Sequence, residues 1–501
     1  NGGLVVPGVY SFSNSVNTPE AASETDAARA VDGYLGRATL AFDRVLYLDL
    51  SARYDVSSTL PVENNSFFYP AATASLIYSE LFDISGMDFG KIRLNYAQVG
   101  NDAPMQRLQN IYSMGTAFGS STLASAPNTG YNSNLLPENT TSLEIGFENK
   151  FFNNKLGLDI TLYQATTDNQ ILAVRPSSSS GTYYQYVNAG KVQNQGNELQ
   201  LYANILQSGD FSWDTRVNWA RNRNEVLELT GNLETYQLGS FQGGVTVEAT
   251  IGESYGSIKG TDFVYHDGER IVVDHPSASR GGMVYGKTAS TQTIGNIMPD
   301  WTGGWTNTFT YKNLTASALI DVQWGGDFFS LDTWYGYGTG IYANQAGTND
   351  AGIEARESIA NGGGLSIGGV MAATDANGDY VLDTDGNYTS DGTENTVNGY
   401  VGDYNNYAGW KNAPNAMHVY DATYIKLRQL SISYSLPSSM FSGKGFQGID
   451  IGIMARNLAI LYKKSPHTDP EAGLSAGNIQ GYQSGAYPAV RELGLNVTFK
   501  F

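Results

Sequence analysis

The sequence contains no cysteine among its 501 residues. Disulfide scaffolds, zinc sites with thiolate ligands and cysteine nucleophiles are therefore excluded. Basic residues are scarce too, since 29 lysines and arginines stand against 48 aspartates and glutamates, a formal net charge of −19 at pH 7. A nucleic-acid-binding protein needs a basic face to meet phosphates, so this balance argues against that class.

Long apolar runs are also missing. No stretch approaches the roughly eighteen apolar residues that a membrane-spanning helix needs. Charged residues make up only 15% of the chain and glycine numbers 58, a composition unsuited to a helical protein. The sequence starts at Asn1 without an initiating methionine or a signal peptide, so we expect it to begin inside a longer gene product.

Alternation of apolar and polar residues is the dominant pattern of the sequence. Successive side chains of a β-strand point to opposite faces, so a strand with one apolar and one polar face shows a period of two. The clearest case ends the chain, where every second side chain is apolar: Leu493, Leu495, Val497, Phe499 and Phe501. The pattern predicts about thirteen strands. They span residues 33–43, 45–56, 67–78, 90–99, 140–150, 155–167, 189–205, 211–226, 299–311, 314–325, 417–436, 449–460 and 490–501.

Alternation alone fits two architectures. A soluble sandwich or propeller turns its apolar face inward, whereas a membrane barrel turns it toward lipid. The connections favour the barrel, because tight turns such as 43–44 and 312–313 alternate with long links, as in outer-membrane barrels. The longest links are 100–139, 227–298, 326–416 and 461–489. We therefore predict an all-β fold, a transmembrane antiparallel β-barrel over residues 33–501 with long extracellular loops, after a loop segment at 1–32.

The odd number of predicted strands has a consequence. Single-chain bacterial barrels close with an even number of strands, because an open edge in lipid leaves backbone groups unpaired at several kcal/mol each. The chain is then either incomplete or completed by another chain, and we expect the first.

Several short motifs follow one another along nearly the whole chain. They are SARYDVSS at 51–58, IRLNYAQVGN at 92–101, QWGGDFF at 323–329, DPE at 469–471 and YPAVRELGLNVTFKF at 487–501. In this order they resemble the SusC/RagA family of TonB-dependent outer-membrane transporters. The resemblance implies a barrel of about 22 strands, of which this chain holds the C-terminal portion, without the plug and N-terminal domains. The terminal aromatic strand, with Phe501 at its end, is similar to the signal read by the bacterial barrel-insertion machinery.

The same resemblance implies a function. Family members sit in the outer membrane of Gram-negative bacteria and actively import oligomeric nutrients, glycans or peptides. A SusD-like surface lipoprotein acts as a lid, and the TonB complex acts through the plug. Two alternatives stay open: a passive porin or scaffold barrel, and a soluble or surface β-rich binding protein.

Aromatic residues crowd the long links and are candidates for substrate binding. Aromatic rings stack on sugars or hold peptide side chains, and they tolerate a wet site. The alternative is simple packing of the loops or an interfacial girdle. The candidates are Trp334, Tyr335, Tyr337, Tyr404 and Trp410.

One acidic segment has oxygen-bearing side chains at alternate positions, as in a calcium-binding loop. It lacks the flanking helices of that motif, so a solvated loop with Asx turns is the alternative. The candidate ligands are Asp375, Asn377, Asp379, Asp383 and Asp385. No cofactor is required on this view, and Ca²⁺ in an extracellular loop is the single candidate ion.

Motifs for catalysis do not emerge. The segment 281–288 fits the P-loop pattern, but a P-loop works only between a buried strand and a helix, and the flanking sequence predicts neither. The four histidines show no metal-ligand spacing, and no nucleophile elbow is present. We therefore expect no enzymatic activity. A short helix is predicted at 350–361, ending at the glycines 362–364.

Overall fold

The computed structural model describes residues 3–11, 14–16, 27–176, 179, 181–231, 233–441, 445, 447–473, 480–487 and 489–501. Its regular structure is mainly antiparallel β-sheet, and α1 (Leu331–Thr339) is the one α-helix in these ranges. Within the described chain, no helix has both the length and the apolar character needed to cross a membrane.

Thirteen strands form the largest sheet of the described residues, in the order β1-β2-β3-β4-β8-β9-β12-β13-β21-β22-β27-β28-β30. Their bounds are β1 (Val31–Phe42), β2 (Leu46–Ser57), β3 (Ser66–Ile77), β4 (Met87–Asn101), β8 (Glu138–Phe151), β9 (Leu156–Asp168), β12 (Lys191–Ser208), β13 (Phe211–Glu228), β21 (Trp301–Tyr311), β22 (Leu314–Trp324), β27 (Tyr424–Ser435), β28 (Gly448–Lys463) and β30 (Glu492–Lys500). Each overlaps one of the predicted strands, so the predicted antiparallel sheet is confirmed.

Shorter elements fill the links. The strands are β5 (Ser113–Met114), β6 (Ala124–Ser125), β7 (Thr129–Gly130), β10 (Ile171–Val174), β11 (Tyr184–Asn188), β14 (Thr235–Phe241), β15 (Val245–Thr250), β16 (Ser257–Gly260), β17 (Tyr265–His266), β18 (Glu269–Asp274), β19 (Met283–Tyr285), β20 (Gln292–Asn296), β23 (Asp327–Ser330), β24 (Val370–Ala372), β25 (Ser390–Glu394), β26 (Val419–Asp421) and β29 (Tyr482–Gln483). The 3₁₀ turns are η2 (Tyr78–Glu80), η4 (Ala343–Gln345), η5 (Ile359–Asn361), η6 (Asn415–His418) and η7 (Ser438–Phe441).

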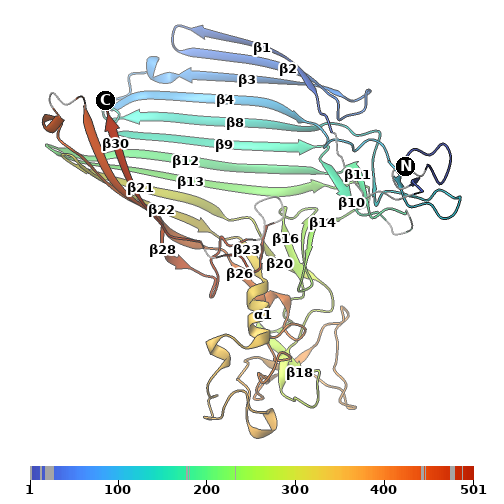
Figure 1. Cartoon of the computed structure of the whole chain (residues 1–501). Helices are drawn as coiled ribbons and strands as arrows, with labels where there is room; N and C mark the ends of the chain where they lie inside the picture. Colours follow the sequence, from blue (N-terminus) through green and yellow to red (C-terminus); the bar gives the residue numbers. More distant parts are fainter. Residues whose placement is uncertain are drawn as a thin grey trace. The chain divides into compact units, whose positions relative to one another are not determined.

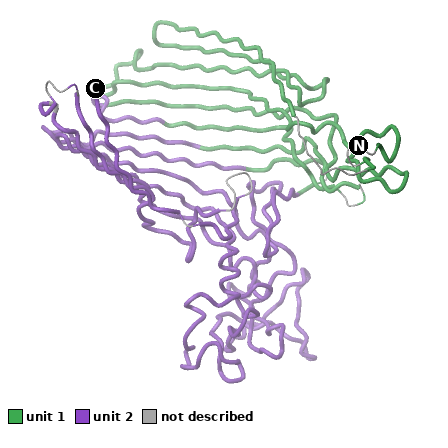
Figure 2. Tube along the Cα trace, in the orientation of Figure 1, with its two compact units in different colours: residues 1–151, 160–196, 225–234 green, residues 152–159, 197–224, 235–501 purple. Residues whose placement is uncertain are grey.

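The chain divides into two compact units (Figure 2). Unit 1 comprises residues 1–151, 160–196 and 225–234, and unit 2 comprises 152–159, 197–224 and 235–501. In unit 1, β1 to β4 and β8 run side by side (Figure 1). The turn from β1 to β2 has Asp43 and Arg44 at φ 49° and 57°. Two successive left-handed residues give a turn whose twist matches that of the flanking strands.

The apolar face of the last strand is uncovered. β30 pairs with β28 so that Leu495 lies opposite Ile453. The four alternate apolar side chains of β30 and the Phe501 side chain after it are exposed by 43–79%. In a sandwich they would be buried against a second sheet, so the structure favours the barrel orientation, with this face toward lipid. Their service as an assembly signal stays a prediction.

The two longest links of unit 2 fold together rather than forming separate loops. β18 from the first link pairs in parallel with β24 from the second, in a sheet ordered β17-β18-β24-β25. A hydrophobic cluster with Phe263, Val272 and Ile367 draws on both links. This sheet was not predicted, because its strands are too short to show a period of two.

Two local predictions in unit 2 are wrong. The strand predicted over 417–436 breaks at Ala422 and Thr423, because β26 leaves the large sheet to pair with β23. The helix predicted at 350–361 is reduced to η5. The true helix, α1, lies earlier, where Ser330 accepts a hydrogen bond from the Thr333 N–H and Gly340 (φ 70°) ends it.

Candidate functional site

The neighbouring strands β27 and β28 of unit 2 both carry bulges. The bulges lie near the start of β27 and the end of β28, where the long links connect. In β27 the pairing with β28 skips Arg428, and in β28 Asn457 adopts a left-handed φ of 49°. A bulge inserts an extra residue and re-aims side chains. The two bulges meet through a hydrogen bond of 2.9 Å from Arg428 Nη1 to Asn457 Oδ1. Arg428 is thereby directed onto the polar face of the sheet.

A network of ion pairs fills this part of the polar face. Lys426, only 3% exposed, pairs with Asp469 Oδ1 at 2.7 Å and with Glu471. Arg428 Nη2 contacts Glu471 Oε1 at 2.7 Å, and its Nε donates to Asp321 Oδ2 at 2.9 Å. The network therefore fastens the DPE segment, from the last long link, onto β22 and β27.

The charge on Glu471 is held by its partners. Burial by itself would raise the pKa of Glu471, but hydrogen bonds from Arg428 and Lys426 outweigh it and lower the pKa to about 2. The carboxylate is therefore ionised throughout the ordinary pH range, as its two cations require.

A cavity of about 620 Å³ opens beside this network. Its walls come from the end of β22, from β23 and from the last long link on either side of the undescribed residues 474–479. Ile297, Gln323, Asp327, Phe328, Ala422, Pro470, Glu471, Ala472, Gly473, Gln480, Gly481, Tyr482 and Gln483 line it. A volume of this size is typical of small-ligand sites. Nothing in the sequence had pointed to it, since the lining residues come from separate segments.

Four of the five predicted aromatic residues come together. Trp334 stacks on Trp410 with ring centroids 5.8 Å apart, and Tyr335 and Tyr404 lie 5.7 and 5.5 Å from the same indole. Tyr337 lies outside this group, next to Tyr342 and His418. Trp334 and Tyr335 also pack on a hydrophobic core, whereas Tyr404 is 53% exposed. The aromatic cluster, Trp334, Tyr335, Tyr404 and Trp410, thus has a packed base and an exposed edge. Its role in binding stays a prediction.

A buried asparagine holds the loop that carries Tyr404 and Trp410. Asn406 is 1% exposed, and its Nδ2 donates to the Tyr337 carbonyl at 2.7 Å. Its Oδ1 accepts from the Ala408 N–H at 3.0 Å. The loop is thereby tied to α1, which fixes the rings before any ligand arrives. The asparagine-rich run at 405–415 is the sequence signal that could have identified it.

Acidification should loosen this region. His418 is fully buried, and burial lowers its pKa to about 4, which a backbone hydrogen bond with Ala408 only partly offsets. The unfolded segment binds a proton near the ordinary pKa of 6.5 and the folded one does not, so the stability is present above 6.5 and falls between pH 6.5 and 4. Hydrogen exchange of α1, corrected for intrinsic rates, is expected to accelerate over that window. The variant His418→Leu should abolish the acceleration, and an unchanged profile in that variant would contradict the assignment.

The five predicted calcium ligands serve two consecutive turns. Asp375 Oδ1 accepts from the N–H groups of Asn377 and Asp379, and Asp383 Oδ1 accepts from those of Asp385 and Asn387. These hydrogen bonds lower the pKa of both Asp375 and Asp383. In the described part of the chain, no three acidic or histidine side chains are grouped to hold a metal. Calcium binding stays a prediction that isothermal titration would test.

The segment that matches the P-loop pattern has another structure. Its Met283–Tyr285 portion is strand β19, and Lys287 Nζ donates to the Lys411 carbonyl at 2.5 Å. The residues that follow form β20 rather than a helix. The match is therefore a coincidence of spacing, as predicted.

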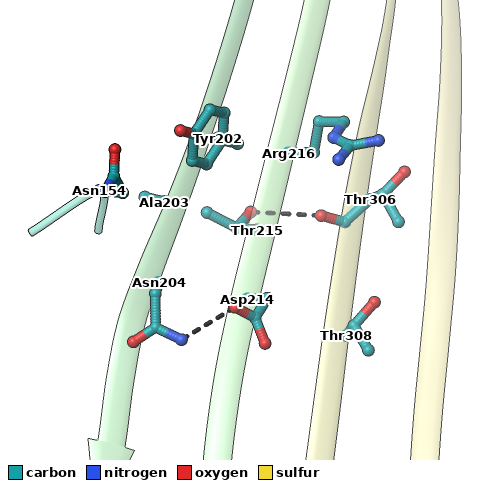
Figure 3. Close-up of a pocket in the computed structure, with 9 residues that line it drawn as sticks. All are labelled: Asn154, Tyr202, Ala203, Asn204, Asp214, Thr215, Arg216, Thr306 and Thr308. Atoms are coloured by element: carbon teal, nitrogen blue, oxygen red, sulfur yellow. Dashed lines mark hydrogen bonds between the residues drawn. The ribbon is translucent and has the colours of Figure 1, made fainter. Parts of the chain in front are cut away.

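A second hollow, of about 410 Å³, lies on the polar face of β12, β13 and β21 (Figure 3). Asn204 Nδ2 donates to Asp214 Oδ1 at 2.9 Å, and Thr215 Oγ1 donates to the Thr306 carbonyl at 3.3 Å. Asn154, Tyr202, Ala203, Asn204, Asp214, Thr215, Arg216, Thr306 and Thr308 line it. Polar side chains dominate this lining, so we interpret the hollow as a part of the inner barrel wall that faces water.

Comparison with known proteins gives consistent matches. A family model described as "TonB dependent receptor-like, beta-barrel" matches residues 6–352. TonB-dependent receptor P3 of Formosa agariphila is 25% identical over 494 residues, covering 93% of this chain and 45% of that receptor. SusC of Bacteroides thetaiotaomicron is 26% identical over 210 residues, covering 40% of this chain and 21% of that receptor. A structure of the RagAB peptide transporter matches with a TM-score of 0.70 at 20% identity, covering 94% of this chain and 48% of that one.

These matches confirm the resemblance to SusC/RagA receptors. The chain spans about half the length of the curated relatives that it matches over most of its own length. The likeness to RagAB shows the fold, and the family model covers well over half of the chain. The family consists of receptors rather than enzymes, and its barrels are not soluble proteins. The chain belongs to the TonB-dependent receptor family and forms β-barrel wall in the outer membrane of a Gram-negative bacterium.

Proposed function

We propose that this chain forms part of an active importer of oligomeric nutrients, glycans or peptides. On this proposal a SusD-like lipoprotein covers the extracellular side and the TonB complex supplies the energy. The similarity to SusC and the description of RagAB as a peptide transporter support it. The observation that carries it is the 620 Å³ cavity at the loop end of the polar face, lined by strand and link residues together.

Energy dependence separates this proposal from a passive porin. A host that carries the full-length receptor should take up oligomers only while its TonB complex works. Disabling TonB should abolish growth on oligomers and leave growth on monomers unchanged, because monomers diffuse through general porins. Uptake of oligomers that continues without TonB would favour the porin.

Removing the aromatic cluster tests its part in binding. Trp334→Ala and Trp410→Ala should each weaken substrate binding about tenfold, which corresponds to about 1.4 kcal/mol. The reason is that each variant removes a stacking surface and loosens the other indole. Arrays of short oligosaccharides and peptides, probed with the purified receptor, provide the measurement.

The matched control is Trp305→Ala. Trp305 is 45% exposed in β21, and its indole N–H donates to Thr215 Oγ1 of β13 at 2.9 Å. The Trp305→Ala receptor should bind the substrate as tightly as the unmodified receptor does. Unchanged substrate binding by both cluster variants would contradict a role of the aromatic cluster in binding.

A further inference from the structure

One carboxylate in the 620 Å³ cavity, that of Asp327, differs from its neighbours in having no direct ion-pair partner among the described residues. Asp327 Oδ2 accepts a hydrogen bond of 3.0 Å from the Asn296 N–H. Among the described residues, no lysine, arginine or histidine forms an ion pair with Asp327. Its other oxygen is left for whatever enters the cavity.

The neighbouring carboxylates are different, because each has its own cation. Asp421 pairs with Lys464 at 2.5 Å, and Asp300 pairs with Arg223 at 3.1 Å. Asp321, Asp469 and Glu471 are held by Lys426 and Arg428. Asp327 is therefore the exception, because each of these neighbouring carboxylates forms an ion pair with a lysine or an arginine.

The surroundings of Asp327 make its charge costly. Asp327 lies directly opposite Asp421 in the pairing of β23 with β26. Burial raises the pKa of Asp327, and the like charges of Asp421 and Asp300 add to the effect, while Lys464 and the Asn296 N–H oppose it. A bound cation would relieve both the desolvation and the repulsion.

The remaining lining suits a cation with an apolar stem. None of the described lining residues is a lysine, arginine or histidine. Gln323 forms no side-chain hydrogen bond with another described residue, so its amide oxygen is available to a donor. Phe328 and Tyr482 contribute aromatic carbon to the same wall.

We propose that this cavity receives a positively charged group of the imported molecule, an ammonium or a guanidinium, with Asp327 as its counter-ion. The inference rests on the proposed function and selects peptides with basic residues as the substrate class. An uncharged sugar would meet hydrogen-bond acceptors here, but it would not offset the repulsion among Asp327, Asp421 and Asp300.

Three capped peptides test the proposal. They have the sequence Ala-Ala-X-Ala-Ala, acetylated and amidated so that X alone carries charge, with X as lysine, norleucine or glutamate. Isothermal titration into the purified full-length receptor should show the lysine peptide binding at least tenfold more tightly than the norleucine peptide. The glutamate peptide should bind more weakly than either.

Two variants assign the effect to Asp327. Asp327→Asn keeps an oxygen for the Asn296 N–H, so the fold should persist, and the preference for lysine should fall to less than about twofold. Asp267→Asn removes the same charge at a turn where the side chain is 95% exposed, and the preference should stay intact. Heat-modifiable gel mobility checks the fold of each variant.

Several outcomes would overturn the inference. Equal binding of the lysine and norleucine peptides by the unmodified receptor does so without any variant. An Asp327→Asn receptor that still prefers the lysine peptide fully would also overturn it. So would a receptor that binds cello-oligosaccharides and does not bind the peptides. These are equilibrium measurements on the purified receptor, so their failure is distinct from a failure of TonB-dependent uptake in cells.

Discussion

Replacing Lys426 with methionine is expected to release the DPE segment from β27. The ammonium is almost fully buried between Asp469 and Glu471, and the Asp469 side chain is itself only 10% exposed. Removing one partner of a buried ion pair leaves an uncompensated charge and costs about 3–5 kcal/mol. Hydrogen exchange of residues 464–473 should rise accordingly, while heat-modifiable mobility shows that the barrel wall remains folded.

The matched control for this variant is Lys312→Met. Lys312 pairs with Asp210 at 3.6 Å between two tight turns, and both side chains are more than half exposed. An exposed pair contributes about 0–1 kcal/mol, so exchange should hardly change. Adding Asp469→Asn and Glu471→Gln to Lys426→Met should restore much of the protection, because no buried charge is then left alone. Unaltered exchange in Lys426→Met would show that the network does not hold the segment.

The same network sets a pH dependence. The folded-state pKa of Glu471 is about 2, below the ordinary value of 4.5. A depressed carboxylate pKa contributes stability that is complete above pH 4.5 and is lost as the pH falls toward 2. Docking of the DPE segment should therefore persist in mild acid, in contrast to the region around His418, which loosens below pH 6.5.

An arginine on the apolar face should be far more harmful than one on the polar face. Leu430 and Ser431 are adjacent near the middle of β27, and they lie opposite Ala318 and Ser317 of β22. A charge facing hydrocarbon near the membrane midplane costs about 2–4 kcal/mol. Leu430→Arg should lower the free energy of unfolding by that amount in lipid vesicles, measured by urea titration.

Ser431→Arg is the control at the same depth. Its side chain faces the polar side, where water solvates the guanidinium, so we expect a change below about 1 kcal/mol. Equal destabilisation by the two variants would mean that the faces of the sheet are wrongly assigned. A larger loss of unfolding free energy from Ser431→Arg than from Leu430→Arg would mean that the Ser431 face meets lipid.

The bulges show how far a sequence pattern can be followed. In β27 the apolar residues Ile425 and Leu427 are followed by Leu430, so a spacing of three interrupts the spacing of two. That interruption coincides with the bulge at Arg428. The irregularity is thus visible in the sequence. Its consequence, that Arg428 meets Asp321 and Glu471, is not, because those residues come from other parts of the chain.

The candidate site was predictable only in part. Aromatic residues in the links were identified by type, and four of the five do meet around Trp410. Tyr337, the fifth candidate, lies apart from them, because on α1 its ring packs near Tyr342 and His418 instead, and its role in binding stays a prediction. The cavity and Asp327 were missed altogether, since composition does not reveal which carboxylates lack a cation.

The strands, their two faces and the sorting of short turns from long links could all be predicted from the order of the residues. These properties follow from the alternation of side chains along an extended backbone, which is local and needs no knowledge of distant residues. Three other features arise only when the chain folds: β18 joins β24, Trp334 stacks on Trp410, and Asp327 has no ion-pair partner among the described residues. Those facts depend on residues far apart along the chain, and a period of two carries no information about which distant segments will meet.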